Sequence, residues 1–225
     1  MSTNPGRSRS PLPRASALAE RLRLLVLTDR DLAAPRPVAK VVDAALEAGC
    51  RAVQLRMKGA SARELLAQAK DLRKRTHLHQ ALLFINDRVD VALAADADGV
   101  HLGPDDLPVQ VVRDWVGSRL LIGYSTDDPD AAIAAERAGA DYLGCGAVFG
   151  TTTKEVGDEA IGPLRLDEVA RAVAIPVVGI GGITRANVTE VAATAASGAA
   201  VVGAVMSATD PGEAARALLA SFRSR

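Results

Sequence analysis

Short apolar runs alternate with longer amphipathic stretches along most of the chain. The runs have the length of buried β-strands, and they occupy residues 22–28, 52–56, 81–86, 99–103, 120–125, 141–146, 176–181 and 199–204. The intervening stretches carry apolar residues at helical spacing, as Val38, Val41, Val42 and Leu46 do. Helices are therefore predicted at about 38–46, 65–72, 87–95, 108–116, 128–138, 165–173, 186–196 and 211–222.

The strand runs are apolar almost throughout, which is typical of a parallel sheet buried on both faces. Eight strand–helix units in about 200 residues predict a single (β/α)8 TIM barrel, which we assign to residues 21–225. An open doubly wound sheet is the alternative, but no G-x-G-x-x-G follows the first strand. Gly49, Gly139 and Gly198 stand between helices and strands, where left-handed helix C-caps are expected.

The first residues, "MSTNPGRSRSPLPRAS", are rich in Ser, Pro and Arg and contain no acidic residue before Glu20. They also lack the apolar segment of a secretory signal. We expect a disordered tail over residues 1–20, with an organellar transit peptide as the alternative.

Composition narrows the classes of partner. Lys+Arg and Asp+Glu are both 27, so bulk charge does not favour nucleic acid or a membrane surface. Aromatic residues make up 3%, which argues against base stacking, and no apolar run reaches the roughly 18 residues of a membrane span. Two cysteines without a CxxC motif indicate a reducing compartment. We expect a cytoplasmic protein with small-molecule substrates, and homo-oligomerisation stays open.

Candidate chemistry lies at the strand ends, because barrel enzymes draw their active residues from the carboxyl ends of the strands. Every end from the second strand to the eighth is polar or glycine-rich. The residues are Gln54, Arg56, Lys58, Asn86, Asp87, His101, Asp106, Ser125, Thr151, Thr153, Lys154, Gly181, Gly182, Val202 and Gly203.

The stretch "AVQLRMKG" presents Gln54, Arg56 and Lys58 at alternating positions, which share one face of a strand. Two cationic side chains and an amide on one face indicate a binding site for an anion. The alternative explanation is an edge strand whose polar side chains face solvent. Gly181, Gly182 and Gly203 allow close backbone approach to a phosphate at the last two strands. Their alternative role is in tight turns.

Asp87 and Asp106 stand at neighbouring strand ends, and two carboxylates with a substrate phosphate suit Mg²⁺. Taken singly, each is better explained as a helix N-cap. The nearby cations Arg56, Lys58 and Lys154 favour a metal–diphosphate site instead. We interpret His101 as a packed, hydrogen-bonded core residue rather than a base.

From about Leu22 to the last predicted helix, the chain resembles the thiamine-phosphate synthase family. The resemblance is carried, in family order and at similar spacing, by "QLRMKG", "INDRVD", "GVHLGPDDL", "GYS", "GCGAVFGTTTK", "VVGIGGIT" and "VVGAV". It implies a Mg²⁺-dependent transferase that joins hydroxymethylpyrimidine diphosphate to thiazole phosphate, or its 2-carboxy form, and releases diphosphate.

The resemblance also implies residue roles. It assigns the pyrimidine diphosphate to Gln54, Leu55, Arg56, Met57, Lys58, Asn86, Ser125 and Lys154. Arg56, Lys58, Ser125 and Lys154 would be the catalytic members of that group. The thiazole phosphate is assigned to Thr151, Thr152, Thr153, Gly182, Val202 and Gly203, and Mg²⁺ to Asp87 and Asp106.

Three positions depart from the family pattern. Leu25 stands where Tyr is common, Pro104 where Gln is frequent and Gly203 where Ser is frequent. None of these changes removes a charged group. Two alternatives stay open: a thiazole tautomerase of the same fold, and a non-catalytic sensor of a phosphate ligand.

Overall fold

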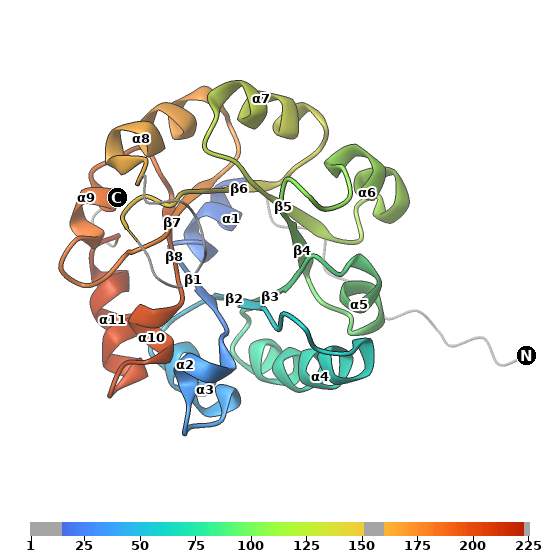
Figure 1. Cartoon of the computed structure of the whole chain (residues 1–225), viewed down its shortest axis with the longest axis vertical. Helices are drawn as coiled ribbons and strands as arrows, with labels where there is room; N and C mark the ends of the chain where they lie inside the picture. Colours follow the sequence, from blue (N-terminus) through green and yellow to red (C-terminus); the bar gives the residue numbers. More distant parts are fainter. Residues whose placement is uncertain (1–14, 151–159, 223–225) are drawn as a thin grey trace, which may run out of the picture.

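Eight of the apolar runs form the strands of one closed parallel barrel, in the order of the sequence (Figure 1). A computed structural model describes residues 15–150 and 160–222. The strands are β1 (Leu24–Leu27), β2 (Ala52–Leu55), β3 (Leu82–Asn86), β4 (Gly99–Leu102), β5 (Leu121–Ser125), β6 (Tyr142–Cys145), β7 (Val177–Ile180) and β8 (Gly198–Val201). The predicted TIM barrel is confirmed, and each strand lies within its predicted run to within one residue.

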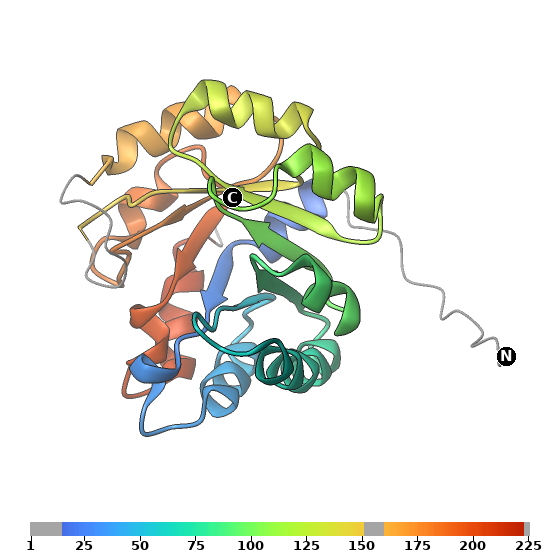
Figure 2. The same cartoon turned by 45° about the vertical axis from the view of Figure 1, so that its right-hand side comes forward.

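Helices surround the strands on the outside (Figure 2). They are α2 (Arg30–Ala33), α3 (Val38–Glu47), α4 (Ala62–Leu78), α5 (Val89–Ala94), α6 (Val109–Val116), α7 (Pro129–Arg137), α8 (Gly162–Ala172), α9 (Val188–Ala192), α10 (Gly203–Met206) and α11 (Pro211–Ala220). The two four-residue helices α2 and α10 were not predicted, because so short a segment shows no helical period. In the described ranges no helix is long and apolar enough to cross a membrane.

Alternate strand residues face opposite sides of the barrel wall. One set packs under the helices in a large apolar cluster, to which Val26, Val53 and Ile85 belong. The other set fills the floor of the barrel, where Leu25, Phe84 and Tyr142 meet side chains from the other strands. The inward side chains nearer the carboxyl ends are therefore the ones left to line a site.

The floor is closed by α1 (Ala15–Arg21), which lies across the amino ends of the strands (Figure 1). Its Leu18 and the following Leu22 are 1% and 0% exposed and join the floor cluster. Burial of two leucines stabilises the fold by up to about 3–6 kcal/mol. Residues 15–20, which we expected in a disordered tail, are thus helical from Ala15. The prediction for residues 1–14 falls outside the described part of the chain.

Two of the three junction glycines act as predicted. Gly49 follows α3 with φ +106° and Gly139 follows α7 with φ +97°, both in the left-handed region. The prediction for Gly198 is wrong, since it is the first residue of β8. A Cβ there would lie 2.0 Å from the carbonyl oxygen of Leu22, so this glycine allows the chain before β1 to pass close to β8.

Two aspartates repeat one arrangement at the amino ends of the strands. Asp98 Oδ2, just before β4, accepts the N–H of Leu83 at 2.8 Å and pairs with Arg73 at 2.9 Å. Asp141 Oδ2, just before β6, accepts the N–H of Ile122 at 2.7 Å and pairs with Arg113 at 2.5 Å. Each carboxylate therefore ties a strand to its neighbour and to a helix.

Candidate active site at the mouth of the barrel

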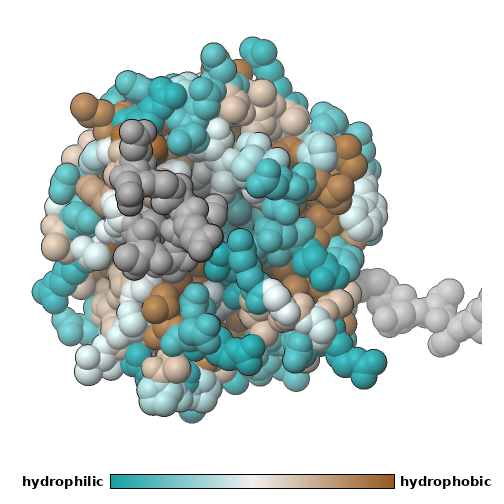
Figure 3. Space-filling model, viewed as in Figure 1, coloured by the Kyte–Doolittle hydropathy of each residue, from teal (hydrophilic) through white to brown (hydrophobic). Residues whose placement is uncertain are grey.

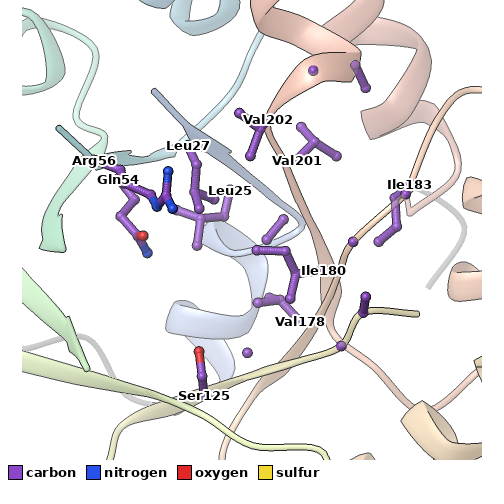
Figure 4. Close-up of a pocket in the computed structure, with 18 of the residues that line it drawn as sticks. Leu25, Leu27, Gln54, Arg56, Ser125, Val178, Ile180, Ile183, Val201 and Val202 are labelled. Carbon is purple, nitrogen blue, oxygen red and sulfur yellow. The ribbon is translucent and has the colours of Figure 1, made fainter. Parts of the chain in front are cut away.

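The inward positions at the carboxyl ends of the strands enclose a cavity of about 460 Å³. Figure 4 shows Gln54 and Arg56 on one side of it, Ser125 on another strand, and Ile180 with Val202 on a third side. Hydrophilic residues gather near the centre of this face of the molecule (Figure 3). Of the candidate residues at the strand ends, those that line the cavity are Gln54, Arg56, Asn86, His101, Ser125, Gly181, Gly182, Val202 and Gly203.

Gln54 and Arg56 share a face, as their alternation predicts, but β2 ends at Leu55. The backbone of Arg56 is held instead by the buried side chain of Thr28. The N–H of Arg56 donates to Thr28 Oγ1 at 3.0 Å, and the same hydroxyl donates to the carbonyl of Arg56 at 3.3 Å. Thr28 thus prolongs the pairing of β1 with β2 to the residue that enters the cavity.

The other members of this stretch do not line the cavity. Lys58 lies in a turn beyond the strand and is exposed, so alternation along a strand does not describe its position. Leu55 and Met57 pack into the cluster under the helices. None of the ion pairs found in the described ranges involves Arg56 or Lys58.

Asp87 and Asp106 lie together beside the cavity, and neither is a helix N-cap. The residue at the N-cap of α5 is Arg88, and that of α6 is Pro108. Asp87 directly follows β3 with φ +63°, a conformation that Asp and Asn tolerate better than most residues. Asp106 Oδ2 accepts the N–H of Gly103 at 2.7 Å and so closes its own loop. The N-cap interpretation is therefore wrong for both.

The two carboxyl groups are close enough to affect each other. Burial, a hydrogen bond to Asp106 and its negative charge raise the pKa of Asp87 to about 6, while the cations Lys58 and Arg56 act in the opposite direction. In the absence of a cation this site therefore holds a proton more tightly than an ordinary aspartate does.

No cluster of three or more His, Cys, Asp or Glu side chains suited to a metal occurs in the described ranges. Two adjacent carboxylates are nevertheless the protein donors that Mg²⁺ ordinarily uses when a substrate phosphate and water complete its shell. Asp87, whose pKa is raised, and Asp106 beside it fit that role.

The loop after β7 is shaped by glycines. Gly181 and Gly182 have φ of +97° and +62°, and a Cβ at Gly182 would lie 2.4 Å from the carbonyl of Gly150. At Gly203 a Cβ would meet no described protein atom closer than 3.8 Å, so the space beside it belongs to the cavity. The first two glycines are required by the packing of loops, and the third leaves room for a ligand.

His101 is 9% exposed and hydrogen-bonded, as predicted, and it also lines the cavity. Its Nδ1 lies 2.9 Å from the hydroxyl of Tyr142, and its Nε2 lies 2.8 Å from Ser125 Oγ. Tyr142 and Thr28 were not predicted as site residues from the sequence. Both lie in apolar strand runs whose sequence is typical of a buried core. Only the alternation of inward and outward positions along the strands could have indicated them.

The remaining predicted site residues, Thr151, Thr152, Thr153 and Lys154, lie outside the described residues. Their roles stay predictions. Gly150, the last described residue before them, lines the cavity.

Comparisons with known proteins agree with the geometry. The sequence profile of the family described as thiamine monophosphate synthase matches residues 24–205. Thiamine-phosphate synthase of Pyrococcus horikoshii is 48% identical over 191 residues, 85% of this chain and 90% of that protein. That of Natronomonas pharaonis is 46% identical over 195 residues, 86% of this chain and 91% of that protein. The solved structure of thiamine phosphate pyrophosphorylase from Pyrococcus furiosus superposes with a TM-score of 0.83 at 44% identity, covering 91% of this chain and 97% of that one.

Proposed function

The chain belongs to the thiamine monophosphate synthase family, and from that premise we propose how its barrel mouth carries out the family's reaction. The protein is a thiamine-phosphate synthase, a transferase that condenses hydroxymethylpyrimidine diphosphate with thiazole phosphate. The bond between the pyrimidine methylene and the diphosphate oxygen breaks, and diphosphate leaves with the electron pair. The thiazole nitrogen supplies the pair for the new carbon–nitrogen bond, so no proton has to move.

The observation that carries the proposal is the gathering of opposite charges at one side of the cavity. Arg56 lines the cavity, and both Arg56 and Lys58 act on the Asp87 carboxyl, which lies beside that of Asp106. A diphosphate placed there meets two cations that are not held in ion pairs with described residues. Charge that develops on the leaving oxygen is stabilised where it forms, which lowers the barrier.

Asp87 and Asp106 would hold the Mg²⁺, which would supply further positive charge to the diphosphate. A cation held by these residues would also offset the negative charge of Asp106, which adds to burial and a hydrogen bond in raising the pKa of Asp87. Lys154 is assigned to the same diphosphate through the family resemblance.

Apolar side chains provide the rest of the pyrimidine site. Leu25, Leu27, Val178 and Ile180 line the inner part of the cavity, and a flat ring can pack against them. Leu25 replaces the aromatic residue common in the family and leaves aliphatic contact area in its place. Gln54, Asn86 and Ser125 are the polar groups that orient the ring and the diphosphate.

We assign the thiazole phosphate to the opposite side of the cavity. Gly182, Val202 and Gly203 line it there, and the open space beside Gly203 leaves room for a ligand. Thr151, Thr152 and Thr153 are assigned to the same phosphate by resemblance.

The family resemblance implies a dissociative path through a pyrimidine cation, in which a strong base has no task. His101 agrees with this path, because both of its ring nitrogens are engaged by Tyr142 and Ser125. A thiazole tautomerase would need an acid–base residue more than a diphosphate site, and a sensor would have no use for paired metal carboxylates. Neither alternative is favoured.

Three finer assignments extend the proposal. The buried free cysteines Cys50 and Cys145 accord with a reducing, cytoplasmic location. Use of the 2-carboxy thiazole and formation of a homo-oligomer stay predictions, which substrate comparison and light scattering test directly.

The testing experiment measures diphosphate release with both substrates, with each alone, and with EDTA. We expect release only with both substrates, its loss in EDTA and its return on adding Mg²⁺. Conversion of the thiazole without diphosphate release would indicate the tautomerase, and binding without turnover would indicate the sensor.

A further inference from the structure

We propose that Tyr142 and His101 are positioning residues that hold the Ser125 hydroxyl as a hydrogen-bond donor toward the pyrimidine diphosphate. The inference rests on the proposed function for its substrate. It assigns a task to two residues that the family resemblance leaves without one.

The contact geometry forms a continuous chain across three strands. Tyr142 Oη lies 2.9 Å from His101 Nδ1, and His101 Nε2 lies 2.8 Å from Ser125 Oγ. The two rings have centroids 5.4 Å apart. At its other end the Tyr142 hydroxyl is hydrogen-bonded by the side chain of Gln54. The chain therefore begins and ends at residues that line the cavity.

The barrel leaves space for this chain at two glycines on its inner face. Gly123 pairs with His101 on one side and with Tyr142 on the other. A Cβ at Gly123 would lie 2.3 Å from Tyr142 Cζ and 2.5 Å from His101 Nδ1. A Cβ at Gly144 would lie 3.3 Å from His101 Cε1 and 3.7 Å from Ser125 Oγ. Any side chain at Gly123 would displace the two rings.

The direction of the hydrogen bonds follows from the chemistry of the two buried groups. Tyr142 is fully buried, and its hydroxyl lies 2.9 Å from His101 Nδ1. A phenol O–H is a stronger donor than an imidazole N–H, and an unprotonated imidazole nitrogen is a stronger acceptor than a phenol oxygen, so Tyr142 donates to His101 Nδ1. His101 must carry its own proton on Nε2 and donate it to Ser125 Oγ.

Ser125 accepts from His101, so its single proton points away from the imidazole. Ser125 lines the cavity, and its hydroxyl therefore presents a donor to an acceptor atom of the bound pyrimidine diphosphate. With the opposite direction along the chain, Ser125 would donate to His101 and offer only lone pairs to the ligand.

The first test is a double-mutant cycle on kcat. Tyr142→Phe keeps the ring but removes the group that fixes the His101 tautomer, so kcat should fall roughly tenfold, the value of one well-aligned hydrogen bond. In a Ser125→Ala background the same substitution should change kcat by less than about twofold, because its effect acts through Ser125. Equal losses in both backgrounds would overturn the proposal. Tyr124→Phe is the matched control, since Tyr124 packs against the outer cluster and should leave kcat unchanged.

The second test needs no substrate and so separates this inference from the proposed function. Imidazole ¹⁵N spectra of the unliganded wild-type protein should show His101, identified by the signals that His101→Gln removes, as a neutral imidazole protonated on Nε2. The chain has three histidines, and the other two are His77 and His79. A His101 protonated on Nδ1, or on both nitrogens at neutral pH, would overturn the proposal. Absence of diphosphate release alone would contradict the function and not this hydrogen-bond direction.

Discussion

At the amino ends of the strands, Asp98 and Asp141 each accept a backbone N–H and pair with an arginine from a neighbouring helix. At the carboxyl ends, Asp87 and Asp106 lie beside each other, and Arg56 lines an open cavity. Aspartates at the amino ends of the strands thus have donors and arginines of the protein as partners, whereas the two aspartates at the carboxyl ends lie next to each other. The first arrangement stabilises the fold, and the second holds an unfavourable interaction that a bound cation, as proposed above, would reduce. Substitutions at the two ends should therefore affect different measurements.

The largest expected effect is on turnover, at Asp87. Asp87→Asn removes the charge that would hold Mg²⁺ but keeps a residue that tolerates φ +63°. We expect kcat/KM to fall by about a hundredfold or more at low Mg²⁺, as for loss of one electrostatic group at a reacting centre, with little change in melting temperature. Asp105→Asn, on the exposed neighbour, is the control and should leave the rate unchanged. Near-normal activity of Asp87→Asn would remove this residue from the metal site.

The opposite pattern is expected at Asp141. Asp141→Ala leaves the N–H of Ile122 without its acceptor and Arg113 without its carboxylate. We expect the free energy of unfolding to fall by about 1.5–3 kcal/mol, the range for hydrogen bonds to charged groups. Kcat at a temperature well below the melt should stay unchanged. A rate loss without destabilisation would show that the two ends are not separate in function.

A smaller effect is expected at Thr28, which links the core to the cavity. Thr28→Val leaves the N–H of Arg56 without its acceptor, and we expect kcat/KM to fall by about fivefold, equivalent to about 1 kcal/mol. Thr28→Ser retains the hydroxyl and should recover most of the rate. If Ser and Val variants lose activity equally, the methyl contact matters and the hydrogen bonds to Arg56 do not.

The smallest effect concerns pH. The pKa of Asp87 is raised from 3.8 to about 6 in the folded protein, so the folded state binds this proton more tightly than the unfolded state does. The stabilisation is fully present below about pH 4 and is lost as the pH rises through about 6. In EDTA, the melting temperature of the wild type relative to Asp87→Asn should therefore decrease across that window, and Mg²⁺ should oppose the decrease at neutral pH. A difference that increases with pH would mean that Asp87 is stabilised as a carboxylate.

The strands and most helices could be predicted because short apolar runs and helical spacing report burial directly. α1 could not, since it directly follows a stretch rich in Ser, Pro and Arg, and only Leu18 and Leu22, one turn apart, enter the core. The site was predicted where charged residues stand at strand ends. Thr28 and Tyr142 were missed because their importance depends on which residue the neighbouring strand places opposite them, and this register is a property of the closed barrel.

The floor formed by α1 determines how ligands enter and leave the cavity. Leu18 and Leu22 are buried against the strands and close the bottom of the barrel. Ligands that enter at the carboxyl ends of the strands therefore have to leave by the same opening. A ring seated against Leu25 and Val178 at its inner part has to arrive before a second ligand covers it, and it leaves after that ligand or joined to it. We therefore expect a compulsory order of addition, visible as uncompetitive inhibition against the inner ligand by a dead-end analogue of the outer ligand.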